Sequence, residues 1–133
     1  MKKYISIGFL LIFLLNGCSI VETDGKKMED IEFTVVEESQ IPDELKVAIE
    51  EKATGEFKLT FATKEELYIV VGYGTQPTNG YSIAVEELYL SSNAIYINTT
   101  LIGPAKGDTV SEVESTPYIV TKMKYIDKSV VFE

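Results

Sequence analysis

The side chains that most often carry out catalysis are missing from this sequence or poorly placed in it. The 133-residue chain has no histidine, and its twelve basic residues are all lysine. Histidine-based triads, HExxH zinc sites and arginine clamps therefore cannot be built. What remains are adjacent acidic pairs: Glu37-Glu38, Asp43-Glu44, Glu50-Glu51, Glu65-Glu66 and Glu86-Glu87. Neighbouring residues of a strand point to opposite faces, so such pairs do not converge as glycosidase carboxylates do, and we interpret them as solvated surface.

Two further local patterns do not indicate a site. Asp24-Gly25-Lys26-Lys27 lacks the acids at alternating positions that a calcium loop needs. Asn98-Thr99-Thr100 matches a glycosylation triplet but falls inside a predicted strand. We therefore expect a protein that is not an enzyme and holds no metal and no cofactor.

The only cysteine, Cys18, follows an amino-terminal segment shaped like a signal peptide. Lys2 and Lys3 precede an apolar run from Ile5 to Leu15, which is too short to cross a bilayer as a helix. Leu15-Asn16-Gly17-Cys18 resembles the bacterial lipobox, whose cysteine is lipidated and becomes the mature terminus. The alternative is an ordinary secretory signal with a chance cysteine. We expect a signal peptide at 1–17, lipid on Cys18 and attachment to the extracytoplasmic face of a bacterial membrane.

Net charge and chain length limit which partners and how many domains the protein can have. Twelve lysines against 21 acidic residues give a net charge of −9. Without residues 1–17, ten lysines and 21 acidic residues remain, a net charge of −11. Nucleic acid is excluded as a partner at that charge. The length fits one domain, which we place at 31–133 after a polar tether at 18–30.

Hydropathy patterning predicts a mainly β domain with one amino-terminal helix. Ile31, Phe33 and Val35 alternate with polar residues as in a half-buried strand. Pro42 favours a helix from about 42 to 53, with Gly55 as its carboxyl-terminal cap. Further strands are predicted near 57–61, 67–73, 81–90 with a bulge at Glu86-Glu87, 95–101, 118–125 and 129–132. We expect the helix to pack on an antiparallel sheet or on a β-sandwich-like domain, an α+β fold.

The segment between the strands at 67–73 and 81–90 is the most distinctive in the chain. Pro77 restricts the backbone, and Asn79-Gly80 readily takes positive φ, so the loop is expected to be preformed. Its candidate partner-binding residues are Thr75, Gln76, Pro77, Thr78, Asn79, Gly80 and Tyr81. From physics alone, a hairpin turn is the simplest interpretation. If the strands at 67–73 and 118–125 are neighbours, a second loop at 102–116 joins this one in a single binding edge.

Gln76-Pro77-Thr78-Asn79-Gly80-Tyr81-Ser82-Ile83, with Ile69–Gly72 before it and Thr116–Val120 after it, resembles the C-terminal domain of the PrcB family. The resemblance covers about 67–124. In that family Pro-Thr-x-Gly-Tyr joins two strands, and Asn79 stands where glycine is common. The family takes its name from a lipoprotein subunit of a secreted protease complex. The resemblance therefore implies a membrane-anchored, non-catalytic module that anchors, matures or stabilises a secreted protease.

The same loop is similar to the Asn-Pro-Thr-Thr-Gly-Tyr loop of chagasin-like inhibitors, which are β-sandwiches that wedge loops into papain-like clefts. Pro77, Thr78, Gly80 and Tyr81 match it. The chain lacks the Gly-x-Gly-Gly loop, the tryptophan and the arginine of that family. Direct protease inhibition is therefore the alternative function, and a structural envelope lipoprotein is a third.

Overall fold

A computed structural model of the protein describes residues 27–133. The signal peptide predicted at 1–17, Cys18 and the tether as far as residue 26 lie outside the described residues. The elements are β1 (Lys27–Asp30), β2 (Phe33–Val35), a short 3₁₀ turn (Glu38–Gln40), α1 (Asp43–Lys52), β3 (Glu56–Ala62), β4 (Glu66–Tyr73), β5 (Ser82–Ser91), β6 (Ile95–Ile102), β7 (Tyr118–Lys124) and β8 (Val130–Phe132). In this part of the chain no helix has the length and apolar character of a membrane span.

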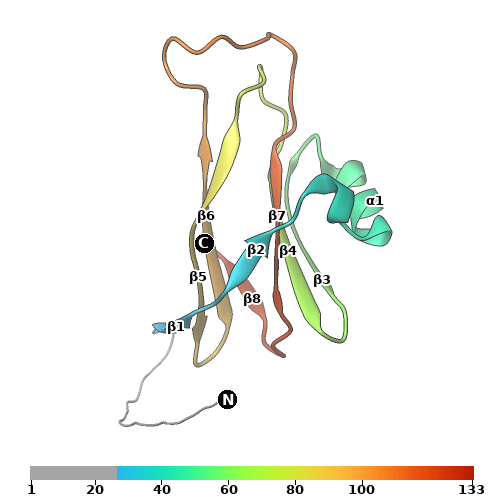
Figure 1. The fold of residues 1–133 in the computed structure, drawn as a ribbon, viewed down its shortest axis with the longest axis vertical. Coiled ribbons are helices and arrows are strands. Elements are labelled where there is room, and N and C mark those ends of the chain that lie inside the picture. The colour runs from blue at the N-terminus through green and yellow to red at the C-terminus, as the bar shows by residue number, and fades with distance from the viewer. Residues whose placement is uncertain (1–26) are drawn as a thin grey trace.

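The strands form two four-stranded sheets. Sheet A has the order β1-β5-β6-β8, and sheet B has the order β2-β7-β4-β3. The sheets lie face to face, and α1 lies against sheet B (Figure 1). The predicted α+β, β-sandwich-like domain is confirmed. One strand pair departs from the antiparallel expectation, because β8 returns parallel to β6, pairing Ile95 with Val130.

Sheet B is covered on both faces, which explains why β4 is its most buried strand. Ile69 and Leu67 face sheet A and pack in a core with Leu88, Ile95 and Ile97. The alternate residues Tyr68 and Val70 pack on the other face against Leu45 and Ile49 of α1. A strand buried on both faces reads as a continuous apolar run, as predicted for a central strand.

The helix begins and ends close to the predicted residues. Pro42 is its N-cap, and Asp43 and Glu44 follow in the first turn, where acidic side chains suit the helix dipole. The predicted cap at Gly55 is wrong, because the C-cap is Ala53 in right-handed helical geometry. Gly55 instead donates a hydrogen bond from its N–H to the Lys52 carbonyl at 3.2 Å.

Two local predictions concern the edges of the sheets. The bulge predicted at Glu86-Glu87 is confirmed by a register shift between Val85 and Glu87 in the β5–β6 pairing. The tether was expected to extend to residue 30, but β1 occupies Lys27–Asp30 and pairs with the end of β5. The sequence signal missed β1 because Lys-Met-Glu-Asp lacks the β-branched and aromatic residues that favour strands.

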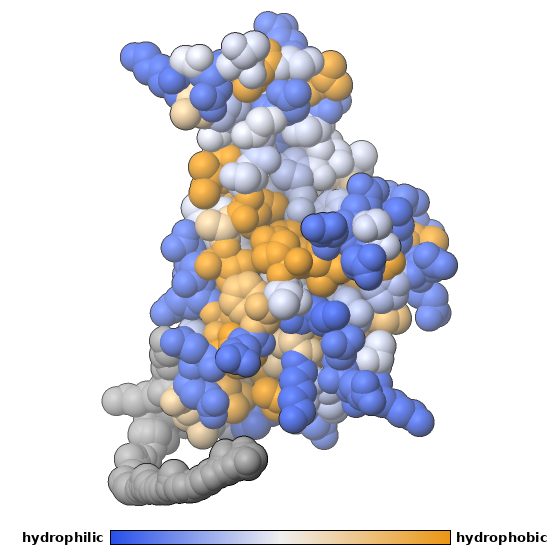
Figure 2. Space-filling view, viewed as in Figure 1, coloured by the Kyte–Doolittle hydropathy of each residue, from blue (hydrophilic) through white to orange (hydrophobic). Residues whose placement is uncertain are grey.

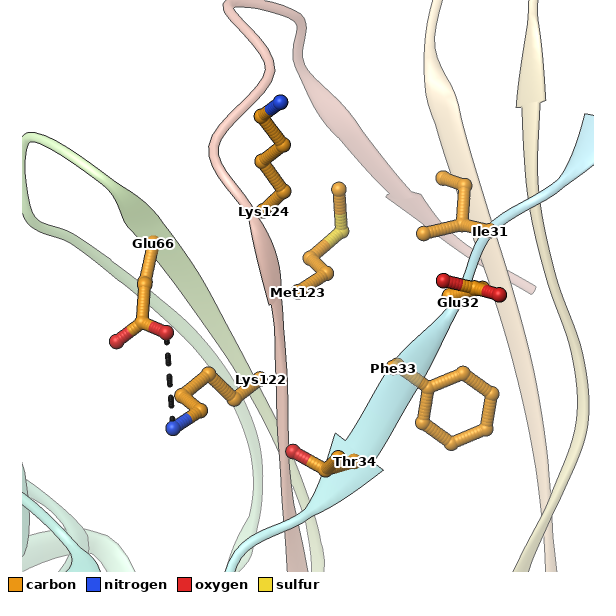
Figure 3. Close-up of a pocket in the computed structure, with 8 residues that line it drawn as sticks. All are labelled: Ile31, Glu32, Phe33, Thr34, Glu66, Lys122, Met123 and Lys124. Atoms are coloured by element: carbon orange, nitrogen blue, oxygen red, sulfur yellow. Dashed lines mark ion pairs between the residues drawn. The ribbon is translucent and has the colours of Figure 1, made fainter. Parts of the chain in front are cut away.

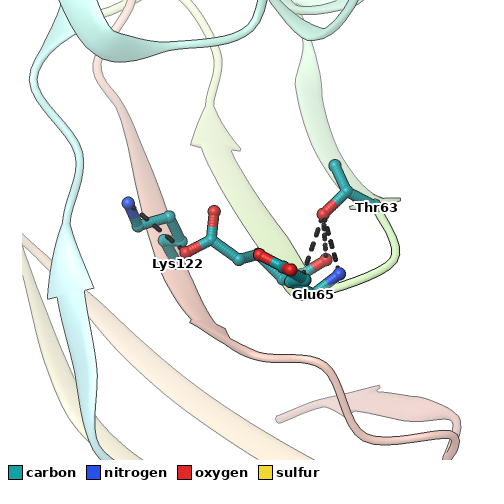
Figure 4. A network of polar contacts seen from close by, with 4 residues as sticks. Thr63, Glu65 and Lys122 are labelled. Carbon is teal, nitrogen blue, oxygen red and sulfur yellow. Dashed lines mark hydrogen bonds and ion pairs between the residues drawn. The ribbon is translucent and has the colours of Figure 1, made fainter.

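The turn from β3 to β4 is closed by Thr63 (Figure 4). The Thr63 N–H donates to the Glu66 carbonyl at 2.8 Å, and the Thr63 hydroxyl oxygen accepts from the Glu66 N–H at 3.0 Å. The Lys122 ammonium lies 3.6 Å from the Glu66 carboxylate, an exposed ion pair that contributes little stability. This turn, the turn at 92–94 and the start of β1 lie at one end of the sandwich, which we call the base.

Gly72 provides a stability test of this packing. A Cβ on Gly72 would lie 2.1 Å from the Phe57 ring, whereas a Cβ on Gly55 would meet nothing within 4 Å. Gly72→Ala is predicted to lower the free energy of unfolding by about 1–3 kcal/mol through overpacking. Gly55→Ala, the matched control, is predicted to change it by less than about 0.5 kcal/mol. Urea denaturation of both variants measures the difference, and equal stabilities would contradict the Phe57–Gly72 packing.

Candidate functional site

The loop at 74–81 crosses between the sheets. It leaves β4 in sheet B and enters β5 in sheet A, so it is not a hairpin turn, and the hairpin interpretation is wrong. The loop at 103–117 makes the reverse crossing from β6 to β7. Both loops lie at the end of the sandwich opposite the base, which we call the loop pole (Figure 1).

Strand pairing brings the two loops together. β4 and β7 are antiparallel neighbours, and Gly72 pairs with Tyr118 at the point where both strands reach the loop pole. Gln76 and Ser115 then form an isolated antiparallel bridge, with N···O distances of 2.7 and 3.1 Å. The condition on which the sequence left the joining of the loops open is therefore met, and the two loops contact each other.

Asn79 and Ser115 add side-chain bonds to this backbone bridge. The Asn79 Oδ1 accepts from the Ser111 N–H at 2.9 Å, and the Asn79 N–H donates to the Ser111 carbonyl at 3.3 Å. The Ser115 hydroxyl donates to the Thr78 carbonyl at 2.7 Å. Each loop thus satisfies backbone groups of the other, so neither shape is independent of its neighbour.

Apolar contacts complete the junction. Gly80 has φ of +90°, and a Cβ placed there would lie 3.1 Å from Val110 and 3.2 Å from Pro104 of the other loop. The Tyr81 ring lies over Gly103, because a Cβ on Gly103 would be 3.3 Å from that ring. Positive φ together with close neighbours leaves little room for a side chain at position 80.

The polar side chains singled out in the sequence mostly bond within the protein. The Thr75 hydroxyl donates to the Thr54 carbonyl at 3.2 Å, and the Gln76 amide donates to the Tyr73 carbonyl at 3.1 Å. The Thr78 hydroxyl donates to the Asn79 carbonyl at 2.9 Å. These bonds shape the loop, in which Thr75, Pro77, Asn79 and Gly80 are exposed and Gln76 and Thr78 are half-buried. Their role in binding a partner stays a prediction.

A residue that sequence reasoning missed is Val113 in the second loop. Its side chain is 67% exposed and lies between Glu112 and Glu114. The structural role of Tyr73 was also missed. Its hydroxyl forms a hydrogen bond of 2.6 Å with the Thr99 hydroxyl and so links the two sheets. Neither residue could be found from a periodic hydropathy pattern. Val113 lies in a loop, and the contact of Tyr73 depends on how the two sheets pack.

An open groove lies beside β2. It has a volume of about 660 Å³ and is lined by Ile31, Glu32, Phe33, Thr34, Glu66, Lys122, Met123 and Lys124. Figure 3 shows Lys122 turned to Glu66 and the apolar Ile31, Phe33 and Met123 between the strands. Thr34 is the only hydroxyl in the lining. No activated nucleophile with an adjacent base is assembled there.

Two tyrosines have shifted acidities. Burial raises the pKa of Tyr118, and the carboxylates of Glu38 and Glu50 raise it further. The neighbouring Asp127 raises the pKa of Tyr125. Both phenols stay protonated near neutral pH, where a general base must be ionised. Among residues 27–133, no three or more metal-ligating side chains come together.

One part of the chain matches a known protein family. Residues 67–124, which are 58 of the 133 residues, match the family described as PrcB C-terminal. This segment, less than half of the chain, is similar to the C-terminal part of PrcB proteins. The match confirms the resemblance and covers β4 to β7 together with the whole loop pole. No curated protein and no solved structure matches the chain.

Asn79 tests whether the two loops depend on each other. Asn79→Ala removes the acceptor of the Ser111 N–H. It is predicted to speed hydrogen exchange of the Ser111 amide at least severalfold and to lower stability by about 0.5–1.5 kcal/mol. Thr109→Ala, an exposed position in the same loop, is the control and should leave that exchange unchanged. Unchanged exchange in Asn79→Ala would show that the loops are not coupled through this contact.

Proposed function

We propose that the protein is a lipid-anchored, non-catalytic subunit that binds an extracytoplasmic protease complex through its loop pole. The observation that carries the proposal is the interlocked pair of loops within the segment that matches the PrcB family. The name of that family comes from a lipoprotein subunit of a secreted protease complex. The lack of histidine and arginine in this chain accords with a binding role.

The loop pole suits protein binding because its shape exists before a partner arrives. The bonds between Gln76 and Ser115 and between Asn79 and Ser111 hold both loops in place. A binding surface that is already ordered loses less conformational entropy on association. Loops on a rigid sandwich are also where binding residues of β proteins commonly lie.

The amino-terminal end of the described chain and the loop pole lie at opposite ends of the domain. Lys27 pairs with Ser91 at the base, whereas Ser82, at the other end of the ten-residue β5, adjoins the loop pole. At about 3.3 Å per residue, β5 separates the two ends by about 30 Å. The nine residue steps from Cys18 to Lys27 reach at most about 32 Å. A lipid on Cys18 would therefore hold the base near the bilayer and leave the loop pole facing outward.

Lipidation at Cys18 has its own test. Wild-type protein is predicted to partition with membranes and to carry a covalently bound diacylglyceryl group, because two acyl chains give durable membrane attachment. Cys18→Ser should lose the lipid mass and move to the soluble or culture fraction. Mass spectrometry of the mature terminus and detergent phase partitioning measure this. A lipid-free wild-type terminus at any other residue would favour the ordinary secretory signal.

Partner binding is tested by crosslinking the lipidated protein in its native membrane and identifying the captured proteins by mass spectrometry. Wild type is predicted to capture a secreted protease, and Pro77→Ala, Gly80→Val is predicted to lose it. The second substitution forces a branched side chain onto a positive-φ position in contact with Val110. Gly55→Val is the matched control, because that glycine has open space around it.

The outcomes separate the candidate functions. A protease captured by wild type and by the Gly55 control, but not by the loop variant, supports the proposal. Inhibition of the isolated protease by added protein would identify an inhibitor instead of an anchoring subunit. Capture of envelope proteins without a protease, unchanged in the loop variant, would make the protein a structural lipoprotein and contradict the proposal.

A further inference from the structure

Within residues 27–133, half of β5 has no strand beside it on the side away from β6. β1 pairs only with the end of β5, from Tyr89 to Ser91, and the Ile31 N–H then donates to the Leu88 carbonyl at 2.9 Å. The chain next crosses to sheet B and forms β2. Among the described residues, 82–85 and Glu87 pair with β6 alone, and Glu86 lies at the register shift between them. Unpaired strand edges are templates for an added strand.

The sandwich is open and apolar beside this edge. Phe33 of β2 packs in the core between the sheets, and Val35 lies on the same face two residues later. Val35 is nevertheless 58% exposed, so sheet A does not cover it. Figure 2 shows an apolar area in the middle of this view, over β2 and β7 and below the more hydrophilic loop pole. An added strand on β5 would cover apolar surface as well as pair its backbone.

A recess marks the lower end of the free edge. It has a volume of about 280 Å³ and is lined by Asp30, Ile31, Phe33, Val85, Glu86, Glu87 and Leu88. The bulge between Val85 and Glu87 interrupts the regular ladder here and places two exposed carboxylates, those of Glu86 and Glu87, at the recess. Apolar walls with carboxylates suit a lysine or arginine side chain, whose stem packs on the walls while its head pairs with the acids.

We propose that the free edge of β5, at residues 82–87, binds an extended segment of the partner as an added strand, with a lysine or arginine side chain in the recess. The strand runs antiparallel to β5, in line with β1. The inference rests on the proposed function and deepens it, because Ser82 directly follows Tyr81 of the loop pole. A protease bound at the loops can therefore lay a flanking basic segment along β5.

The test uses a labelled, capped heptapeptide of alternating threonine and valine with one lysine near its amino end, and a twin with glutamate in place of the lysine. Binding to the full chain in detergent is measured by fluorescence anisotropy. The lysine peptide is expected to bind at least about tenfold more tightly than its twin. Hydrogen exchange should show new protection of the amides in 82–87 only when the lysine peptide is present.

Charge reversal supplies the matched comparison. Glu86→Lys, Glu87→Lys is expected to weaken binding of the lysine peptide about tenfold or more, whereas Glu50→Lys, Glu51→Lys on α1 should leave it unchanged. Equal binding of both peptides, equal effects of both reversals, or no protection of 82–87 would overturn the inference. So would protection in the free chain that disappears when residues 19–26 are deleted, because the chain's own segment would then occupy the edge.

The peptide assay and protease capture can give different results, so they test the added strand and the proposed partner separately. Pro77→Ala, Gly80→Val should lose the protease yet keep the peptide, because the loop residues do not line the recess. Peptide failure with intact protease capture rejects the added strand alone. Peptide binding without any protease rejects the proposed partner and shows that the edge serves another extended basic segment.

Discussion

The antiparallel pairing of β4 with β7 places the two crossings between the sheets side by side and so creates the loop pole. β4 runs toward the loop pole, and the chain crosses to sheet A, returns through the β5–β6 hairpin and crosses back to β7. Because β7 descends beside β4, both crossings must lie at the same end and next to each other. The contact between the loops follows from this topology, and the bonds of Asn79 and Ser115 then fix its detail.

Helices and strands could be predicted from the sequence where burial of one or both faces of an element determined its hydropathy pattern. Phe57, Leu59 and Phe61 alternate because one face of β3 meets the helix, and β4 is continuously apolar because both of its faces are covered. The helix was predictable from Pro42 and the stripe of Leu45 and Ile49. The pairing of β8 was not, because three residues carry no information about which strand they join or in which direction.

The loop pole shows the same limit of sequence-based prediction. Pro77 and Asn79-Gly80 give identical local signals for a hairpin and for a crossing between sheets, since both need a tight, preformed turn. The loop could therefore be located from the sequence, but the interpretation of it as a hairpin turn was wrong. It also indicated polar groups that face outward, whereas Thr75, Gln76 and Thr78 bond mainly to the protein itself. The exposed surface of the loop pole therefore includes Pro77 and Val113 as well as amide and hydroxyl groups.

We propose the interlocked loops as the surface that meets the protease complex. Hydrogen exchange of the lipidated protein, free and assembled with the captured protease, measures this directly. We expect new protection of the amides in 74–81 and 103–117, with exchange in α1 unchanged. Protection confined to α1 and β3, with both loops exchanging as in the free protein, would contradict it.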